Sequence, residues 1–152
     1  MKNIIGTDIP RFDARTKVTG EEKFAIDCYM EHMLWAGVKR SGIPHGKIKH
    51  IDVSCAEKIP GVVKILTGKD VPGTNRQGII HKDMPVIADS KVRYSGDPVA
   101  LVLAENKDIL KEALEVIKIN IEPLEAVFDT EQAMKPDAPC VHEENKNGNI
   151  LV

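Results

Sequence analysis

Two glycines five residues apart, Gly73 and Gly78, give the stretch PGTNRQGII the spacing of a phosphate-binding loop. Such a loop also needs a lysine and then a serine or threonine after the second glycine, because the lysine supplies charge to the phosphates and the hydroxyl binds magnesium. Ile79 and Ile80 occupy those two positions. Two apolar side chains cannot neutralise a triphosphate, so the sequence argues against nucleotide binding here.

The other residue types that could do chemistry are scattered along the chain. No histidine belongs to an HExxH motif or has a Cys-x-x-Cys companion, so no metal site is predicted. The cysteines are odd in number and far apart, which indicates reduced thiols in a cytosolic protein rather than a disulfide framework. These residues are His32, His45, His50, His81, His142, Cys28, Cys55 and Cys140. The chain thus shows no complete catalytic constellation.

The composition argues against several classes of partner. The 152 residues include 21 Lys and Arg against 23 Asp and Glu, so no broad electrostatic field favours nucleic acid or an anionic membrane. Aromatic residues make up only 4%, too few for a base-stacking platform. No apolar run approaches the roughly 18 to 20 residues of a membrane span, and the start does not match a signal peptide. We therefore expect a soluble, cytoplasmic domain.

The elements that must position any site are short. Apolar runs at 24–27, 33–40, 46–53 and 62–66 have the length and residue types of strands. Residues 99–104 are apolar on both faces, which predicts a strand in the centre of its sheet. Between the runs at 46–53 and 62–66, Ser54 and Glu57 have the spacing of a capping box and predict a short helix that ends before Pro60.

A longer helix is predicted to begin after Asn106, whose side chain can cap it. Its apolar positions recur every three or four residues, and residues 117–121 then alternate between isoleucine and polar residues, as in a half-buried strand. A strand, a helix and a strand with almost no linker suggest a right-handed parallel crossover. The predicted fold class is α+β, with about six strands and two principal helices.

Three segments are predicted along the chain. Residues 1–20 lack any helix or strand period and are interpreted as an extended arm. Residues 21–140 form the domain itself, and residues 141–152 begin a linker. The final run Ile150-Leu151-Val152 is apolar and favours a strand, so we interpret the chain as a domain excised from a longer protein.

Several blocks of the sequence resemble one known family. These are PRFDARTKVTGEEKFAID, LWAGVKRSGIPHGKIKHIDVS, IPGVVKILTGKDVPG and VIADSKVRYSGDPVALVLAE, continued by IEPLEAVFDTEQAM and by His142 with Gly148-Asn149. In this order they resemble the N-terminal part of the large, molybdenum-cofactor-binding subunit of the xanthine dehydrogenase and aldehyde oxidase family. The segment is called the α/β-hammerhead domain there, in agreement with the α+β inventory.

The resemblance implies a role within a larger oxidoreductase. The parent enzyme would hydroxylate a carbon of a purine or another heterocycle, or of an aldehyde, with oxygen taken from water. Its molybdenum–molybdopterin cofactor would bind to C-terminal domains of the same subunit, and iron–sulfur clusters and FAD to partner domains or subunits. No cofactor, metal or catalytic residue is assigned to this chain, which is expected to be inactive alone.

One site can be carried over from the family. A glycine followed by bulky apolar residues after the DVPG block helps to form the substrate funnel, and here these residues are Gly78, Ile79 and Ile80. The alternative is that the two isoleucines pin the loop to the domain's own core. Asp97 stands where relatives often have glutamine, so its role is left open. At the level of the whole chain, the alternative is a free-standing, non-catalytic binding module with the same fold.

Overall fold

The computed structural model describes residues 5–145 and 147–150. Contacts between Cα atoms divide the chain into two units, with the boundary between Met33 and Leu34. The predicted boundaries after residues 20 and 140 stay predictions. Of the predicted strand at 150–152, residues 151 and 152 lie outside the described residues, and Ile150 has no regular secondary structure.

The first unit contains two short helices, α1 (Ala14–Thr19) and the 3₁₀ helix η1 (Ala25–Asp27). Asp13 precedes α1, and its carboxylate pairs with Lys17 at 2.6 Å. The segment predicted to be extended thus includes a short helix of six residues. The strand predicted at 24–27 is wrong, because the Asp27 carboxylate accepts a hydrogen bond from the Phe24 amide at 3.0 Å and closes a turn. No described residue of this unit is buried.

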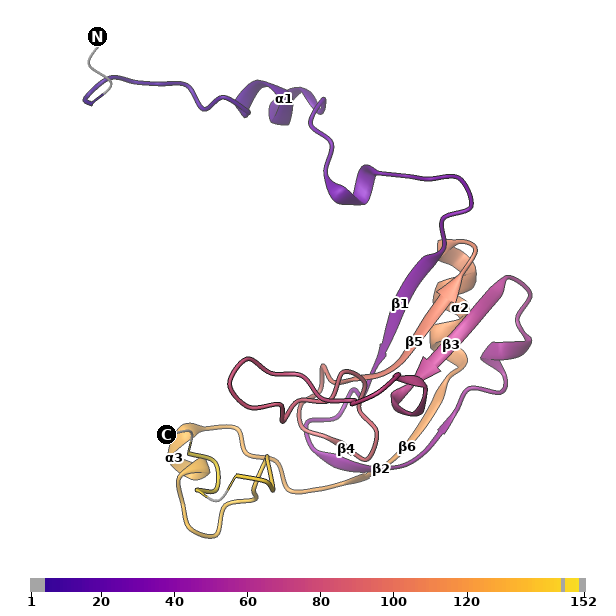
Figure 1. The fold of residues 1–152 in the computed structure, drawn as a ribbon, viewed down its shortest axis with the longest axis vertical. Helices are drawn as coiled ribbons and strands as arrows, with labels where there is room; N and C mark the ends of the chain where they lie inside the picture. The colour runs from indigo at the N-terminus through magenta and orange to yellow at the C-terminus, as the bar shows by residue number, and fades with distance from the viewer. Residues whose placement is uncertain (1–4, 146, 151–152) are drawn as a thin grey trace. The chain divides into compact units, whose positions relative to one another are not determined.

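The second unit contains two three-stranded sheets (Figure 1). Every strand pairing in them is antiparallel. The first sheet has the order β1-β5-β3, with β1 at Trp35–Arg40, β5 at Pro98–Ala104 and β3 at Val62–Thr67. The second has the order β4-β2-β6, with β4 at Lys91–Val92, β2 at Gly46–Asp52 and β6 at Lys118–Pro123. The predicted number of about six strands and the α+β class are confirmed, although β4 takes the place of the strand predicted at 24–27.

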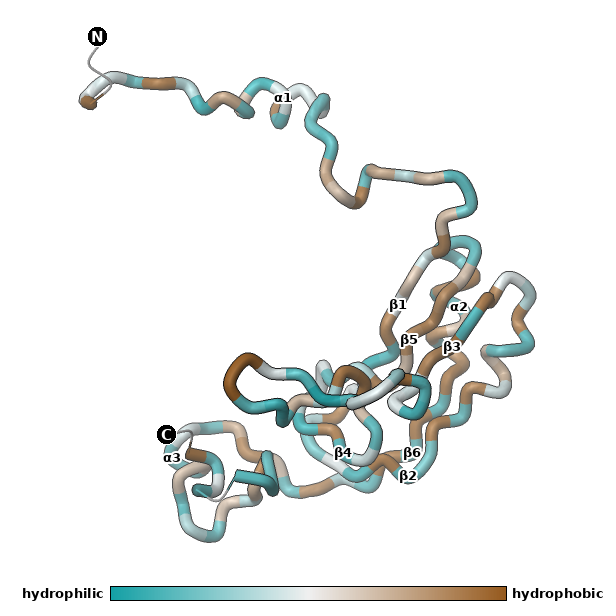
Figure 2. Tube along the Cα trace, viewed as in Figure 1, coloured by the Kyte–Doolittle hydropathy of each residue, from teal (hydrophilic) through white to brown (hydrophobic). Residues whose placement is uncertain are grey.

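The centre of the core lies on β5, as its apolar sequence predicts. Val99, Val102 and Ala104 are fully buried, and the run is brown along this strand in Figure 2. Helix α2 (Lys107–Val116) packs on the same sheet through Ala113, with Leu110 and Leu114 beside it. A second buried cluster, Ala88, Val92 and Val99, packs against isoleucines of β2 and β6 and so joins the two sheets.

Helix α2 begins where the sequence predicts. The Asn106 side chain accepts a hydrogen bond from the Ile109 amide at 2.9 Å, which satisfies one of the free donors of the first turn. At its other end, the Lys39 amine donates to the Leu114 carbonyl at 2.6 Å. Helix α2 therefore has polar partners for its backbone at both ends.

The predicted parallel crossover is wrong. The chain leaves β5, passes through α2 and enters β6, but β6 pairs antiparallel with β2 in the other sheet. Both edges of β5 are already occupied, by β1 and by β3, so neither is free for a further strand. Strand β6 instead completes the second sheet.

The capping box predicted at Ser54 and Glu57 is also wrong. The Ser54 hydroxyl donates to the Asp52 carboxylate at 2.6 Å, and the segment forms only the 3₁₀ helix η2 (Ala56–Lys58). The Asp52 carboxylate, two residues before Ser54, thus takes the place predicted for the Glu57 carboxylate. The other short helices are η3 (Gly68–Asp70) and α3 (Thr130–Ala133), so α2 is the one long helix of the described residues.

Candidate functional site

The segment that holds Gly78, Ile79 and Ile80 is a loop between η3 and β4, and Asn75 fixes its base. The Asn75 side-chain oxygen accepts hydrogen bonds from the Val86 and Ile87 amides at 3.0 and 3.1 Å. Its side-chain nitrogen donates to the Ile87 carbonyl at 2.7 Å. One side chain thus joins the two ends of residues 75–87, which we call the 75–87 loop.

A second tie lies nearer the end of the loop. Gln77 and Met84 form an isolated antiparallel bridge with N···O distances of 2.7 and 3.2 Å. Beyond this bridge remain residues 78–83, which we call the tip. Because backbone hydrogen bonds hold the tip at its start and its end, it is presented on a fixed support.

The loop base also packs on η3. A Cβ atom at Gly68 would lie 3.0 Å from the Ile87 carbonyl oxygen and 3.2 Å from the Asn75 side-chain nitrogen, so the glycine permits this close approach. Arg76 pairs with Asp89 at 3.2 Å. Burial opposes ionisation of Asp89, but hydrogen bonds from Arg76 and Ser90 outweigh it and lower the pKa of its carboxyl.

The tip turns back on itself at Gly78. A Cβ atom there would lie 1.7 Å from the His81 carbonyl oxygen, which no side chain can tolerate. The two residues that follow, Ile79 and Ile80, are fully exposed and 82% exposed. The tip is correspondingly the brown end of a projecting loop in Figure 2. The alternative that these isoleucines pin the loop to the domain's own core is therefore wrong.

Asp97 has a local structural role. It is 4% exposed, and its carboxylate accepts hydrogen bonds from the backbone amides of Arg93 and Tyr94 at 2.5 and 3.4 Å. Its own carbonyl accepts from the Ser41 amide at 3.0 Å. These contacts close the turn between β4 and β5 and leave Asp97 facing backbone donors.

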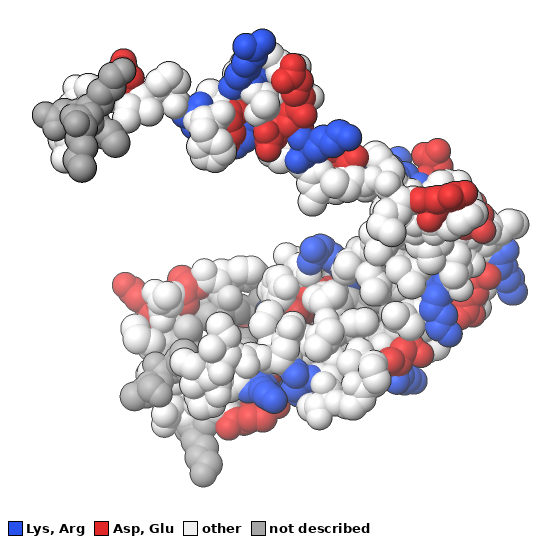
Figure 3. Space-filling model, turned by 45° about the horizontal axis from the view of Figure 1, so that its top comes forward, with Lys and Arg blue, Asp and Glu red and all other residues white. Residues whose placement is uncertain are grey.

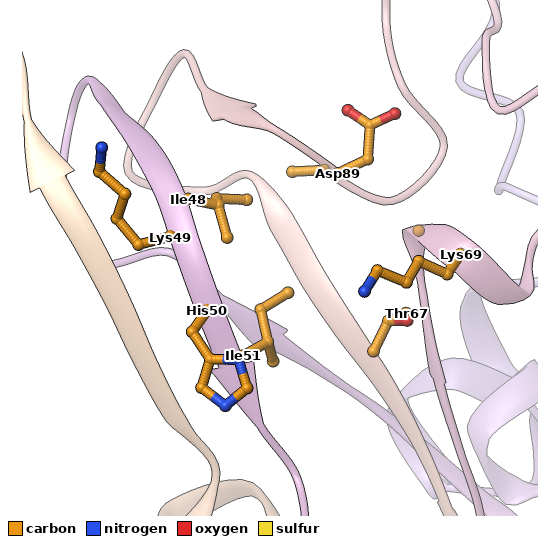
Figure 4. Close-up of a pocket in the computed structure, with 9 residues that line it drawn as sticks. Ile48, Lys49, His50, Ile51, Thr67, Lys69 and Asp89 are labelled. Atoms are coloured by element: carbon orange, nitrogen blue, oxygen red, sulfur yellow. The ribbon is translucent and has the colours of Figure 1, made fainter.

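A small hollow of about 160 Å³ lies between the two sheets (Figure 4). Strand β2 lines one side of it, and Thr67, Lys69 and Asp89 line the other. The charges at this hollow are of both signs, and Lys49 already pairs with Glu122 at 2.6 Å. It therefore lacks the concentration of one charge that an ionic ligand requires.

Metal-binding side chains do not gather in the described part of the chain. Within residues 5–145 and 147–150, no three His, Cys, Asp or Glu side chains lie close enough to hold a metal ion. Cys28, Cys55 and Cys140 are free thiols. Basic and acidic residues both occur in small groups on the face in view in Figure 3, among larger uncharged areas. Among the described helices, none has the length and apolar character needed to cross a bilayer.

The two-sheet fold that carries the 75–87 loop is the fold of a known domain family. Residues 19–125 match the family model described as aldehyde oxidase and xanthine dehydrogenase, a/b hammerhead domain. The chain belongs to this family, and the α/β-hammerhead fold inferred from the sequence blocks is confirmed.

Similarity to individual relatives covers more of the chain than residues 19–125. The chain is 43% identical over 139 residues to the nicotinate dehydrogenase large molybdopterin subunit of Eubacterium barkeri, covering 91% of this chain and 33% of that protein. It is 32% identical over 142 residues to the nicotine 6-hydroxylase large subunit of Paenarthrobacter nicotinovorans, covering 88% and 17%. The chain thus spans a third or less of these curated relatives.

Solved structures give the same result. The aldehyde oxidoreductase of Desulfovibrio desulfuricans superposes with a TM-score of 0.83 at 35% identity, covering 96% of this chain and 17% of that one. The chain is therefore a hammerhead domain of the molybdenum hydroxylase family.

Sequence reasoning placed the tip but missed what supports it. The resemblance brought Gly78, Ile79 and Ile80 together, and they are consecutive at the end of one loop. It gave no role to Asn75, because a side chain that bonds to a backbone 12 residues away has no local motif. The bridge between Gln77 and Met84 is likewise visible only in the folded chain.

Proposed function

We propose that this domain shapes the substrate passage of a molybdenum hydroxylase, with Gly78, Ile79 and Ile80 forming part of its wall. The cofactor would be molybdenum–molybdopterin, held by C-terminal domains of the same subunit. Iron–sulfur and FAD subunits or domains would take up the electrons. The parent oxidoreductase would hydroxylate a purine, another heterocycle or an aldehyde, with water as the oxygen source.

The exposure of the two isoleucines is the observation that supports this role. Burying a side chain of this size is worth roughly 1.5 to 3 kcal/mol, and the domain by itself forgoes that gain at both positions. The supports at Asn75 and at the Gln77–Met84 bridge fix the backbone while the tip stays uncovered. Two apolar side chains on a supported loop suit contact with an apolar wall or an organic substrate.

The residues of this chain would act by shape and by exclusion of water. When bound, the molybdenum cofactor supplies a Lewis acid that activates the oxygen of water. Ile79 and Ile80 would contribute no proton and no ligand, since both side chains are aliphatic. It would discriminate among substrates by size, with each additional buried methylene worth about 0.8 kcal/mol.

Replacement of Ile80 with arginine in the full-length enzyme tests this role. We expect kcat/KM for the largest accepted substrate to fall at least roughly tenfold, because a charge in an apolar passage loses its hydration. The smallest accepted substrate should be affected much less. The substrates come from a screen of aldehydes, purines and other heterocycles, and thermal unfolding is measured in parallel.

Val63→Arg is the matched control. Val63 is also an exposed apolar residue, 51% accessible, but it lies on β3 away from the tip. The control should leave both the substrate preference and the thermal midpoint unchanged. Equal effects of both variants, or no effect of Ile80→Arg on either substrate, would rule out the channel role.

Metal analysis of the purified native complex tests the assignment of the parent enzyme. Molybdenum in stoichiometric amounts, together with turnover of an aldehyde or a heterocycle, is the expected result. A native protein that consists of this domain alone and holds no molybdenum would favour the free-standing binding module.

A further inference from the structure

The segment Cys140–Glu143, which we call the strap, is fastened to β4 by a buried lysine. Lys91 is 8% exposed, and its amine donates to the carbonyls of Cys140 and Val141 at 3.1 and 3.4 Å. The same amine lies 2.6 Å from the Glu143 carboxylate. A buried ammonium group needs such partners to offset its desolvation, so Lys91 and the strap hold one another in place.

Arg93 strengthens this attachment. Its Nε donates to the Val141 carbonyl at 2.9 Å, and its guanidinium lies 3.5 Å from the Glu143 carboxylate. Lys91 and Arg93 together form what we call the cationic clamp. The clamp donates hydrogen bonds to the carbonyls of Cys140 and Val141 at the start of the strap and pairs with the Glu143 carboxylate at its end.

Asn149 completes the support of the strap. Its side-chain oxygen accepts from the Val141 amide at 2.9 Å, and its side-chain nitrogen donates to the carbonyls of Ala133 and Pro139 at 3.2 and 3.0 Å. Val141 therefore has its amide bonded to Asn149 and its carbonyl bonded to the clamp. The backbone next to His142 is fixed from two directions.

His142 faces the last residue of the tip. Its Nδ1 atom lies 3.5 Å from the Asp83 carboxylate. This nitrogen is inaccessible to solvent and has no hydrogen-bond partner, so the Asp83 carboxylate is the ionisable group it faces across a short gap. A hollow of about 500 Å³ adjoins the pair and is lined by Asp83, Phe128 and His142 among others. The tip would have room to move if this contact were lost.

We infer that the strap positions the tip: the clamp fixes Val141 and Glu143, and His142 between them restrains Asp83 and with it Ile79 and Ile80. His142 is in this view a positioning residue, and its effect on turnover rests on the channel role proposed above. Residues 141–143 of the strap also lie in the segment predicted to lead to the cofactor domains. A displacement of that segment would therefore be transmitted to the wall of the passage.

Hydrogen exchange of the full-length enzyme tests this inference independently of activity. In His142→Ala and in Asp83→Asn, peptides covering residues 78–83 should take up deuterium roughly two- to fivefold faster, the range expected for loss of one weak, partly exposed side-chain contact. The double variant should exchange no faster than either single variant, because both act through one contact. His50→Ala, which alters an exposed histidine of β2, is the matched control and should change nothing.

Lys91→Met probes the clamp. It should accelerate exchange both in the strap and in the tip, while His142→Ala accelerates only the tip. Unchanged exchange of residues 78–83 in His142→Ala and Asp83→Asn overturns the inference, whether or not Lys91→Met folds. Additive effects of the two single variants would also overturn it.

The kinetic arm separates this inference from the channel role. Faster exchange of the tip together with a reduced preference for large over small substrates supports both. Faster exchange of the tip with an unchanged substrate preference supports positioning of the tip by the strap. That result would count only against the proposed channel role.

Discussion

Gly78 shows how one residue determines the shape of the tip. The His81 carbonyl lies where a side chain at position 78 would be, so the chain can turn back at this point only with glycine. The consequence is that the next two side chains leave the loop together and remain uncovered. The sequence motif thus has a steric reason that is independent of any ligand.

Gly78→Ala should open the tip. The added methyl group cannot coexist with the His81 carbonyl, so we expect the Gln77–Met84 bridge to weaken and its amides to exchange faster. The free energy of unfolding should fall by only about 1 kcal/mol, since an exposed loop can relax. Hydrogen exchange and urea denaturation measure the two effects. Gly73→Ala is the comparison, because open space surrounds that site and only its backbone is strained; equal exchange in both variants would contradict the steric explanation.

Helix α2 illustrates which elements follow from local sequence. Its cap, its apolar period and its end are encoded within residues 106–117, and the Asn106 hydrogen bond forms as predicted. Packing against the β1-β5-β3 sheet then covers the apolar side of the helix. Local signals and tertiary packing agree here, which is why the prediction succeeds.

Asn106→Ala should destabilise the domain by about 1 kcal/mol, within a range of roughly 0.5 to 2 kcal/mol for loss of a helix cap. The unfolding midpoint in urea measures this change. Asn120→Ala is the matched control, since Asn120 is exposed on β6, and it should stay within about 0.5 kcal/mol of the parent protein. A cap variant no less stable than its control would show that α2 depends on packing alone.

At the scale of the whole molecule, many carboxyl groups are more acidic than in an unfolded chain. Lowered pKa values belong to Asp13, Asp52, Asp70, Asp89, Glu122 and Glu143. A carboxyl with a lowered pKa in the folded state contributes stability that is fully present above its unfolded pKa and is lost as the pH falls through its folded pKa. The domain should therefore lose stability below about pH 4.

Glu143→Gln should flatten part of this acid dependence. The hydrogen bond from Lys91 lowers the pKa of Glu143, so the wild-type interaction weakens on acidification whereas that of the glutamine does not. The expected result is a smaller loss of unfolding free energy between about pH 6 and about pH 3, measured by urea titration at each pH. Glu144→Gln, at an exposed neighbouring position, should retain the full dependence. Identical pH profiles for wild type and Glu143→Gln would refute this prediction.

The sequence by itself determined the local elements and the family. Apolar periods located β1, β2, β3, β5, α2 and β6, and the ordered blocks identified the hammerhead domain. The predictions of these features succeed because each feature depends on neighbouring residues or on a pattern shared along the chain.

The tertiary structure decided the rest. It placed β6 in the second sheet, since β1 and β3 already occupy both edges of β5. It joined the Asn75 side chain to the Ile87 backbone, and it left Ile79 and Ile80 outside the core. Such outcomes depend on which edges, acceptors and surfaces remain available once distant segments have packed, and that competition leaves no mark on any short stretch of sequence.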